Sequence, residues 1–180
     1  MKVLKDMEDK IVVIVNGRPR SGKDTFCNFV IKNCEEKNKN CDVWSTIDFE
    51  KELLEDIVNR PYDVNSEKDR AFLSEFKQLV NRYYDITFRD FVNLIEFYDG
   101  IFLIHSREWN EINRFKEYCE NNNIKFITVF ISSPNEKEYN NWSDTFCIDR
   151  KNMYDIIINN KGTLEELEEY AKQFCESRLF

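Results

Sequence analysis

The chain has 180 residues, a formal net charge of −8 and a charged fraction of 33%, so we expect one domain over residues 1–180 with a core of useful size. The acidic balance argues against a polynucleotide partner, because a nucleic-acid footprint needs a basic surface. Apolar runs stay well below the roughly 18 residues of a membrane span, and residues 1–10 lack the apolar core of a signal peptide, so we expect a cytoplasmic protein without a membrane partner.

Short β-branched runs alternate with segments that carry apolar residues at helical spacing. In chain order we expect a strand at residues 10–16, a helix at 22–37, a strand at 43–47, helices at 49–58, 66–84 and 88–98, a strand at 101–104, a helix at 108–121, strands at 125–131 and 155–158, and a last helix at 164–178. Thr163 and Glu166 have the spacing of a capping box for that last helix. Strands that alternate with helices indicate an α/β fold with a parallel sheet covered on both faces.

The segment between the first strand and the first helix reads Gly-Arg-Pro-Arg-Ser-Gly-Lys-Asp-Thr over residues 17–25. Glycines at this spacing let backbone N–H groups approach a polyphosphate, and the following helix offers the positive end of its dipole. Only four glycines occur in the chain, and two of them stand here. The pattern predicts an ATP-binding P-loop. The predicted nucleotide contacts are Gly17, Arg18, Arg20, Ser21, Gly22, Lys23, Asp24 and Thr25, with Lys23 on the outer phosphates as the main catalytic residue.

The residue after the lysine departs from the usual P-loop pattern. A hydroxyl residue normally stands there and ligates Mg²⁺, whereas here Asp24 is followed by Thr25. A carboxylate oxygen also ligates Mg²⁺ well, and Arg18 and Arg20 would offset its charge beside the phosphates. We therefore expect Asp24 and Thr25 to be the metal ligands.

The loop resembles that of bacteriophage-type deoxynucleoside monophosphate kinases and their bacterial relatives, and its Ser-Gly-Lys-Asp segment is similar to that of animal-type phosphomevalonate kinases. Weaker similarity continues in order through residues 45–52, 69–74, 105–108 and 154–167. The resemblance implies a three-layer P-loop NTPase fold with a five-stranded parallel sheet of order 2-3-1-4-5. It also implies ATP-dependent phosphoryl transfer to a (deoxy)nucleoside monophosphate, and a lid-like insertion near residues 132–150. The sequence leaves the oligomeric state open, with a homodimer as one option.

Four side chains are candidates for the acceptor side. Arg107 follows the third strand, where open α/β sheets bind ligands, and it would hold the acceptor phosphate; pairing with Glu108 or capping the next helix is the alternative. Asp48 would orient the acceptor or a metal-bound water, unless it only caps a helix. Lys51 and Arg70 complete the set, although Arg70 could equally be an ordinary solvated arginine. Arg107 and Asp48 join Lys23 as predicted catalytic residues.

His105 stands at a strand end where the family often carries an aspartate that holds the water shell of the magnesium. The departure leaves His105 either as a general base or as a hydrogen-bonded structural residue. Two other functions stay open. One is a kinase for another small phosphorylated acceptor, such as dephospho-coenzyme A or a phosphomevalonate-like compound, and the other is a nucleotide-binding module without catalysis.

Overall fold

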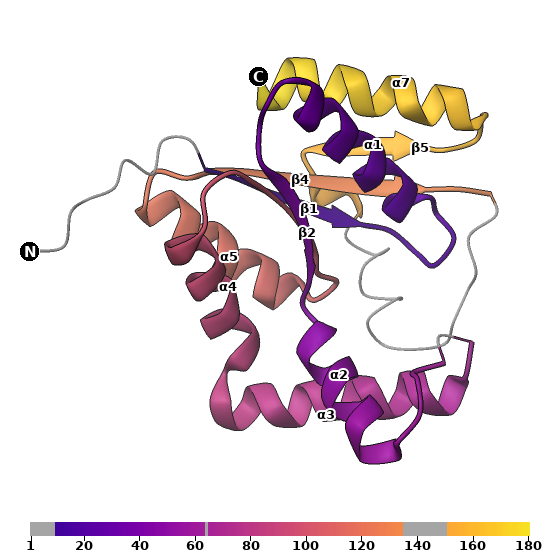
Figure 1. Cartoon of the computed structure of the whole chain (residues 1–180), viewed down its shortest axis with the longest axis vertical. Helices are drawn as coiled ribbons and strands as arrows, with labels where there is room; N and C mark the ends of the chain where they lie inside the picture. Colours follow the sequence, from indigo (N-terminus) through magenta and orange to yellow (C-terminus); the bar gives the residue numbers. More distant parts are fainter. Residues whose placement is uncertain (1–9, 64, 135–150) are drawn as a thin grey trace, which may run out of the picture. The chain divides into compact units, whose positions relative to one another are not determined.

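The computed structural model describes residues 10–63, 65–134 and 151–180. Its main elements are β1 (Ile11–Asn16), α1 (Lys23–Glu36), β2 (Cys41–Ser45), α2 (Asp48–Val58), α3 (Glu67–Tyr84), α4 (Ile86–Phe97), β3 (Ile101–His105), α5 (Trp109–Asn121), β4 (Lys125–Ser132), β5 (Ile156–Asn159) and α7 (Leu164–Phe174) (Figure 1). Most of the predicted lid, residues 135–150, lies outside the described residues. None of the described helices is long and apolar enough to cross a membrane.

Contacts between Cα atoms divide the chain into two units. The first comprises Met1–Trp44 and Tyr98–Phe180, and it contains all of β1, β3, β4 and β5. The second comprises Ser45–Phe97 and contains the helices α2, α3 and α4. That the whole chain acts as one domain stays a prediction.

The first unit is built on a five-stranded sheet of order β2-β3-β1-β4-β5, which confirms the predicted order 2-3-1-4-5. The central strand β1 pairs in parallel with both β3 and β4, and β4 pairs in parallel with β5. From Val12 to Val15, β1 is almost completely buried. This continuous apolar run is typical of a parallel strand that is covered on both faces.

Different helices cover the two faces of this sheet (Figure 1). On one face, Val129 of β4 lies in a core cluster with Phe26 of α1 and Leu167 of α7. The next residue, Phe130, points to the opposite face because successive side chains of a strand alternate. There it packs with Trp109 at the start of α5. The prediction of helices on both faces is therefore confirmed.

Most predicted boundaries agree with the structure to within two residues, and the differences have local causes. The capping box is present, since Glu166 N donates to Thr163 Oγ1 and Thr163 N donates to Glu166 Oε2, both at 3.3 Å. β2 spans 41–45 instead of 43–47, because Thr46 already belongs to the turn before α2. The last helix ends at Phe174 and continues as a π-helical turn, closed by the Phe180 N–H bond to the Cys175 carbonyl.

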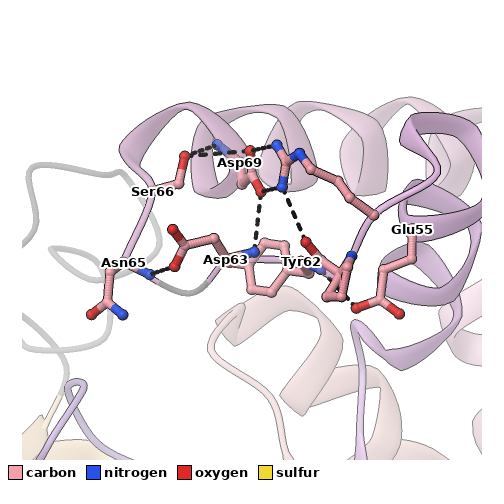
Figure 2. Close-up of polar contacts among 8 residues, drawn as sticks. Glu55, Tyr62, Asp63, Asn65, Ser66 and Asp69 are labelled. Carbon is pink, nitrogen blue, oxygen red and sulfur yellow. Dashed lines mark hydrogen bonds and ion pairs between the residues drawn. The ribbon is translucent and has the colours of Figure 1, made fainter.

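In the second unit, the buried carboxylate of Asp69 holds the loop between α2 and α3. Arg60 donates two hydrogen bonds of 2.6 Å to it, and the backbone N–H of Asp63 donates a third at 3.1 Å. Ser66 is the N-cap of α3, where its hydroxyl accepts from Asp69 N and donates to Asp69 Oδ1 (Figure 2). These donors, with Arg60 the strongest, hold the pKa of Asp69 well below its ordinary value.

The depressed pKa of Asp69 predicts a pH-dependent contribution to stability. The contribution is complete above the unfolded-state pKa of about 3.9, and it is lost as the pH falls further toward the lower folded-state pKa. We therefore expect Arg60→Ala to lower the urea midpoint clearly at pH 7 and by less at pH 2. Circular dichroism at both pH values measures this, with Arg82→Ala, an exposed arginine on α3, as the matched control. A loss for Arg60→Ala that is the same at both pH values would contradict the assignment.

Candidate functional site

The parallel strands of the first unit end on one edge of the sheet, and Asn16 organises that edge. This side chain is 1% exposed at the end of β1. Its amide nitrogen donates to Ser106 O at 2.8 Å and to the Tyr154 hydroxyl at 2.7 Å, while its oxygen accepts from Gly17 N at 2.8 Å. Asn16 thereby joins the ends of β1 and β3 and fixes the entry to the next loop. Ligands of open α/β sheets bind outside such carboxyl ends.

The loop from Gly17 to Gly22 connects β1 to α1 in a conformation that demands glycine at both ends. Gly17 has φ 156° and Gly22 has φ 94°. A Cβ on Gly17 would collide with the backbone oxygen of Ile131, and one on Gly22 would collide with the side chain of Asn160. Between them, Ser21 N donates to Arg18 O at 3.1 Å and closes a turn. The sequence-based reason for the two glycines therefore agrees with the geometry.

The start of α1 presents backbone N–H groups with no acceptor inside the helix. Gly22 occupies the N-cap position, where it offers no side chain to cap the helix. The bond from Phe26 N to Gly22 O, 2.9 Å long, opens the helical series. The N–H groups of Lys23, Asp24 and Thr25 thus precede the first intrahelical donor. Such amides, together with the helix dipole, form a ready site for an anion.

The charged side chains at this helix start form a short chain of contacts. Lys23 Nζ lies 3.2 Å from Asp24 Oδ2, and the other oxygen of Asp24 lies 3.6 Å from His105 Nδ1. His105 Nε2 in turn lies 3.4 Å from Cys27 Sγ. Burial, reinforced by the Asp24 charge, raises the pKa of Cys27 to about 12. The Cys27 thiol is therefore protonated at neutral pH and is a poor nucleophile.

The residues at this loop fit a nucleotide polyphosphate. The Ser21 hydroxyl is buried and has no hydrogen-bond partner among the described residues, a situation that costs free energy unless a ligand or water supplies the bond. The Lys23 side chain is 14% exposed, so its ammonium reaches a ligand from a largely covered position. Asp24 is 73% exposed, and with the Thr25 hydroxyl it supplies the oxygen donors that Mg²⁺ prefers when phosphates and waters complete its shell.

The predicted acceptor residues fall in different units. Arg107 is half-buried in the first unit, two residues beyond the end of β3. Asp48, Lys51 and Arg70 all belong to the second unit, and a role beside the phosphate loop stays a prediction for them. Asp48 does not cap α2, because Ile47 is the N-cap residue; its carboxylate accepts from Ser45 N at 3.0 Å and pairs with Lys51 Nζ at 3.5 Å.

Two side chains of this site were absent from the predicted set, Asn16 and Asn160. The sequence signal for Asn16 is a lone amide at the end of an otherwise apolar strand. Asn160 follows β5, and its side-chain nitrogen donates to Ser21 O at 2.9 Å. This contact joins residues 139 positions apart, and no local pattern reveals it.

No protein-family model matches the chain, and no curated protein matches it. Solved structures do match. Shikimate kinase from Aquifex aeolicus aligns with 94% of this chain and 100% of its own, at a TM-score of 0.52 and 12% identity. A Chloroflexus aurantiacus protein with a provisional kinase assignment aligns with 95% of this chain and 98% of its own, at a TM-score of 0.52 and 10% identity. The protein APE1195 aligns with 96% of this chain and 98% of its own, at a TM-score of 0.51 and 13% identity.

The chain has the P-loop kinase fold. Identities of 10–13% support this statement about the fold and nothing finer. One fold hosts many functions, so the function depends on the chemistry of the site.

Proposed function

We propose that this protein is an ATP-dependent phosphotransferase that passes the γ-phosphoryl group of ATP to a (deoxy)nucleoside monophosphate. The observation that carries the proposal is the start of α1. There the backbone N–H groups of residues 23–25, which have no acceptor inside the helix, lie beside the Lys23 ammonium and directly after the loop of residues 17–22. Two glycines that admit no Cβ shape that loop. The P-loop kinase fold and the resemblance of residues 17–25 to nucleotide kinases support the same conclusion.

Phosphoryl transfer depends mainly on positioning and on charge neutralisation. Lys23 would neutralise the β- and γ-phosphates, and Arg18 and Arg20 add positive charge on the same loop. Asp24 contacts Lys23 at 3.2 Å, so nucleotide binding would exchange this contact for a lysine–phosphate contact and release the carboxylate. Mg²⁺, when bound, would neutralise phosphate charge. Asp24 and Thr25 would hold it.

The acceptor would bind at the same carboxyl edge of the sheet. Arg107 would hold its phosphate, because a guanidinium forms paired hydrogen bonds with phosphate oxygens. Asp48, Lys51 and Arg70 are proposed as acceptor-binding residues from the sequence alone. His105 lies between Asp24 and Cys27, and this favours a positioning role for the imidazole over that of a general base.

A second candidate function is phosphoryl transfer to a small acceptor other than a nucleoside monophosphate. The fold match to a shikimate kinase favours it, as does the likeness of residues 21–24 to phosphomevalonate kinases. Both candidates use the phosphate loop in the same way. They differ only in the acceptor that would take the phosphoryl group.

An assay of ADP release with a panel of acceptors tests the proposal. The panel contains the ribo- and deoxyribonucleoside monophosphates, shikimate, dephospho-coenzyme A and phosphomevalonate. We expect turnover with at least one nucleoside monophosphate. Turnover with only shikimate, dephospho-coenzyme A or phosphomevalonate would select the second candidate. Tight ATP binding without turnover on any acceptor would instead indicate an inert nucleotide-binding module and contradict the proposal.

A further inference from the structure

Asn160 connects the sheet to the phosphate loop. It is half-buried and directly follows β5. Its backbone N–H donates to Ser132 O at 2.7 Å, which extends the pairing of β5 with β4. Its side-chain nitrogen donates to Ser21 O at 2.9 Å. The sheet thus fixes the backbone of Asn160, and the Asn160 side chain holds the Ser21 carbonyl of the loop by a hydrogen bond.

The hydrogen bond to the Ser21 carbonyl also sets the direction of the Gly22 N–H. In a trans peptide the C=O bond and the following N–H bond point in opposite directions, and the described chain contains no cis peptide. The Ser21 oxygen faces Asn160, so the Gly22 N–H must point away from it. A Cβ on Gly22 would meet Asn160 and then Leu167 of α7, so Asn160 lies on the α7 side of the loop. The Gly22 N–H points away from Asn160 and therefore away from that side.

Without this contact, little would fix the orientation of the Ser21–Gly22 peptide. Glycine populates positive and negative φ about equally, so Gly22 sets no steric preference of its own. Arg20, one position before Ser21, also has a positive φ, at 67°. If the peptide flipped, a carbonyl oxygen would replace the N–H that faces the anion, and it would repel a phosphate. The hydrogen bond from Asn160 favours the orientation that suits an anion.

We propose that Asn160 is a positioning residue of the phosphate loop, which holds the Ser21–Gly22 peptide so that the Gly22 N–H serves a nucleotide phosphate. This inference rests on the proposed function of the loop. It adds a residue from the opposite end of the chain to the machinery that binds the nucleotide.

Binding measurements on two Asn160 variants test the inference. Asn160→Ala removes the donor, and Asn160→Asp keeps the shape but places a second acceptor against the Ser21 carbonyl. The control is Asn159→Ala, because Asn159 lies at the same edge of the sheet and its side-chain oxygen accepts a hydrogen bond from Ser132 Oγ at 3.0 Å. We expect Asn160→Ala to weaken ATP and ADP binding by about tenfold, and Asn160→Asp to weaken it more. Adenosine affinity should stay unchanged in both Asn160 variants, and Asn159→Ala should bind ATP and ADP as the wild type does.

A second measurement needs no ligand. The ¹⁵N–¹H resonance of Gly22 should shift in both Asn160 variants and stay in place in Asn159→Ala. Either unchanged ATP affinity in the Asn160 variants, or an equal loss for ATP and adenosine, or an unmoved Gly22 resonance would overturn the inference. Failure of the phosphate loop itself would look different, because wild-type protein would then bind ATP no better than adenosine. Failure of phosphoryl transfer alone would appear in the acceptor assay, as ATP binding without turnover.

Discussion

Replacing Lys23 with alanine should abolish phosphoryl transfer and weaken ATP binding. Lys23 is the cation placed at the first position of α1, beside the backbone amides that would bind the phosphates. Loss of one preorganised charged donor typically lowers kcat by on the order of 10²- to 10³-fold. The effect should be larger here, because the partner left behind is Asp24, whose negative charge would then repel the phosphates with less compensation.

The matched control for this experiment is Lys32→Ala. Lys32 lies on the same helix but is 59% exposed and pairs with Glu168 at 2.9 Å. Surface ion pairs contribute little to stability, so this variant should keep the turnover of the wild type. Steady-state ADP release and calorimetric titration with ATP measure both variants. Wild-type activity in Lys23→Ala would show that the loop has been assigned wrongly.

Replacing Arg107 with alanine should raise the KM of the acceptor far more than the KM of ATP. Arg107 follows Ser106, whose carbonyl accepts from the buried Asn16 and whose hydroxyl bonds to Glu111. These contacts fix the backbone just before the arginine at the carboxyl edge of the sheet. Charge-assisted hydrogen bonds to a phosphate predict an increase in the acceptor KM on the order of 10- to 100-fold.

Kinetics with each substrate varied in turn give the two KM values for Arg107→Ala. The control is Arg114→Ala, an exposed arginine on α5, seven positions further along the chain. It should leave both KM values near those of the wild type. Equal increases in the two KM values for Arg107→Ala would refute its role on the acceptor side.

The sequence was sufficient to predict the fold because the signals for it are local. Each buried strand is a short β-branched run, the capping box lies within four residues, and the loop glycines follow one strand directly. The strand order came from the resemblance, which those local motifs carry. β2 was the least accurate strand, because its end depends on where the turn through Thr46 begins.

The contacts that position the site could not be predicted in the same way. Asn16 reaches Tyr154 across 138 positions, and Asn160 reaches Ser21 across 139 positions. Asn16 is marked in the sequence only as a lone amide at the end of an apolar strand. Asn160 does not differ from an ordinary turn asparagine, because amides are common in turns. The acceptor side is harder still, since its candidates are divided between a strand end of the first unit and the helices of the second.

A crystal structure of the protein with a non-hydrolysable ATP analogue and Mg²⁺ would test the central claim most directly. The account predicts that the backbone amides of residues 22–25 surround the triphosphate, with the Lys23 ammonium beside its outer phosphates and Asp24 turned toward the metal. A triphosphate bound at any other part of the chain, with this loop left uninvolved, would contradict it.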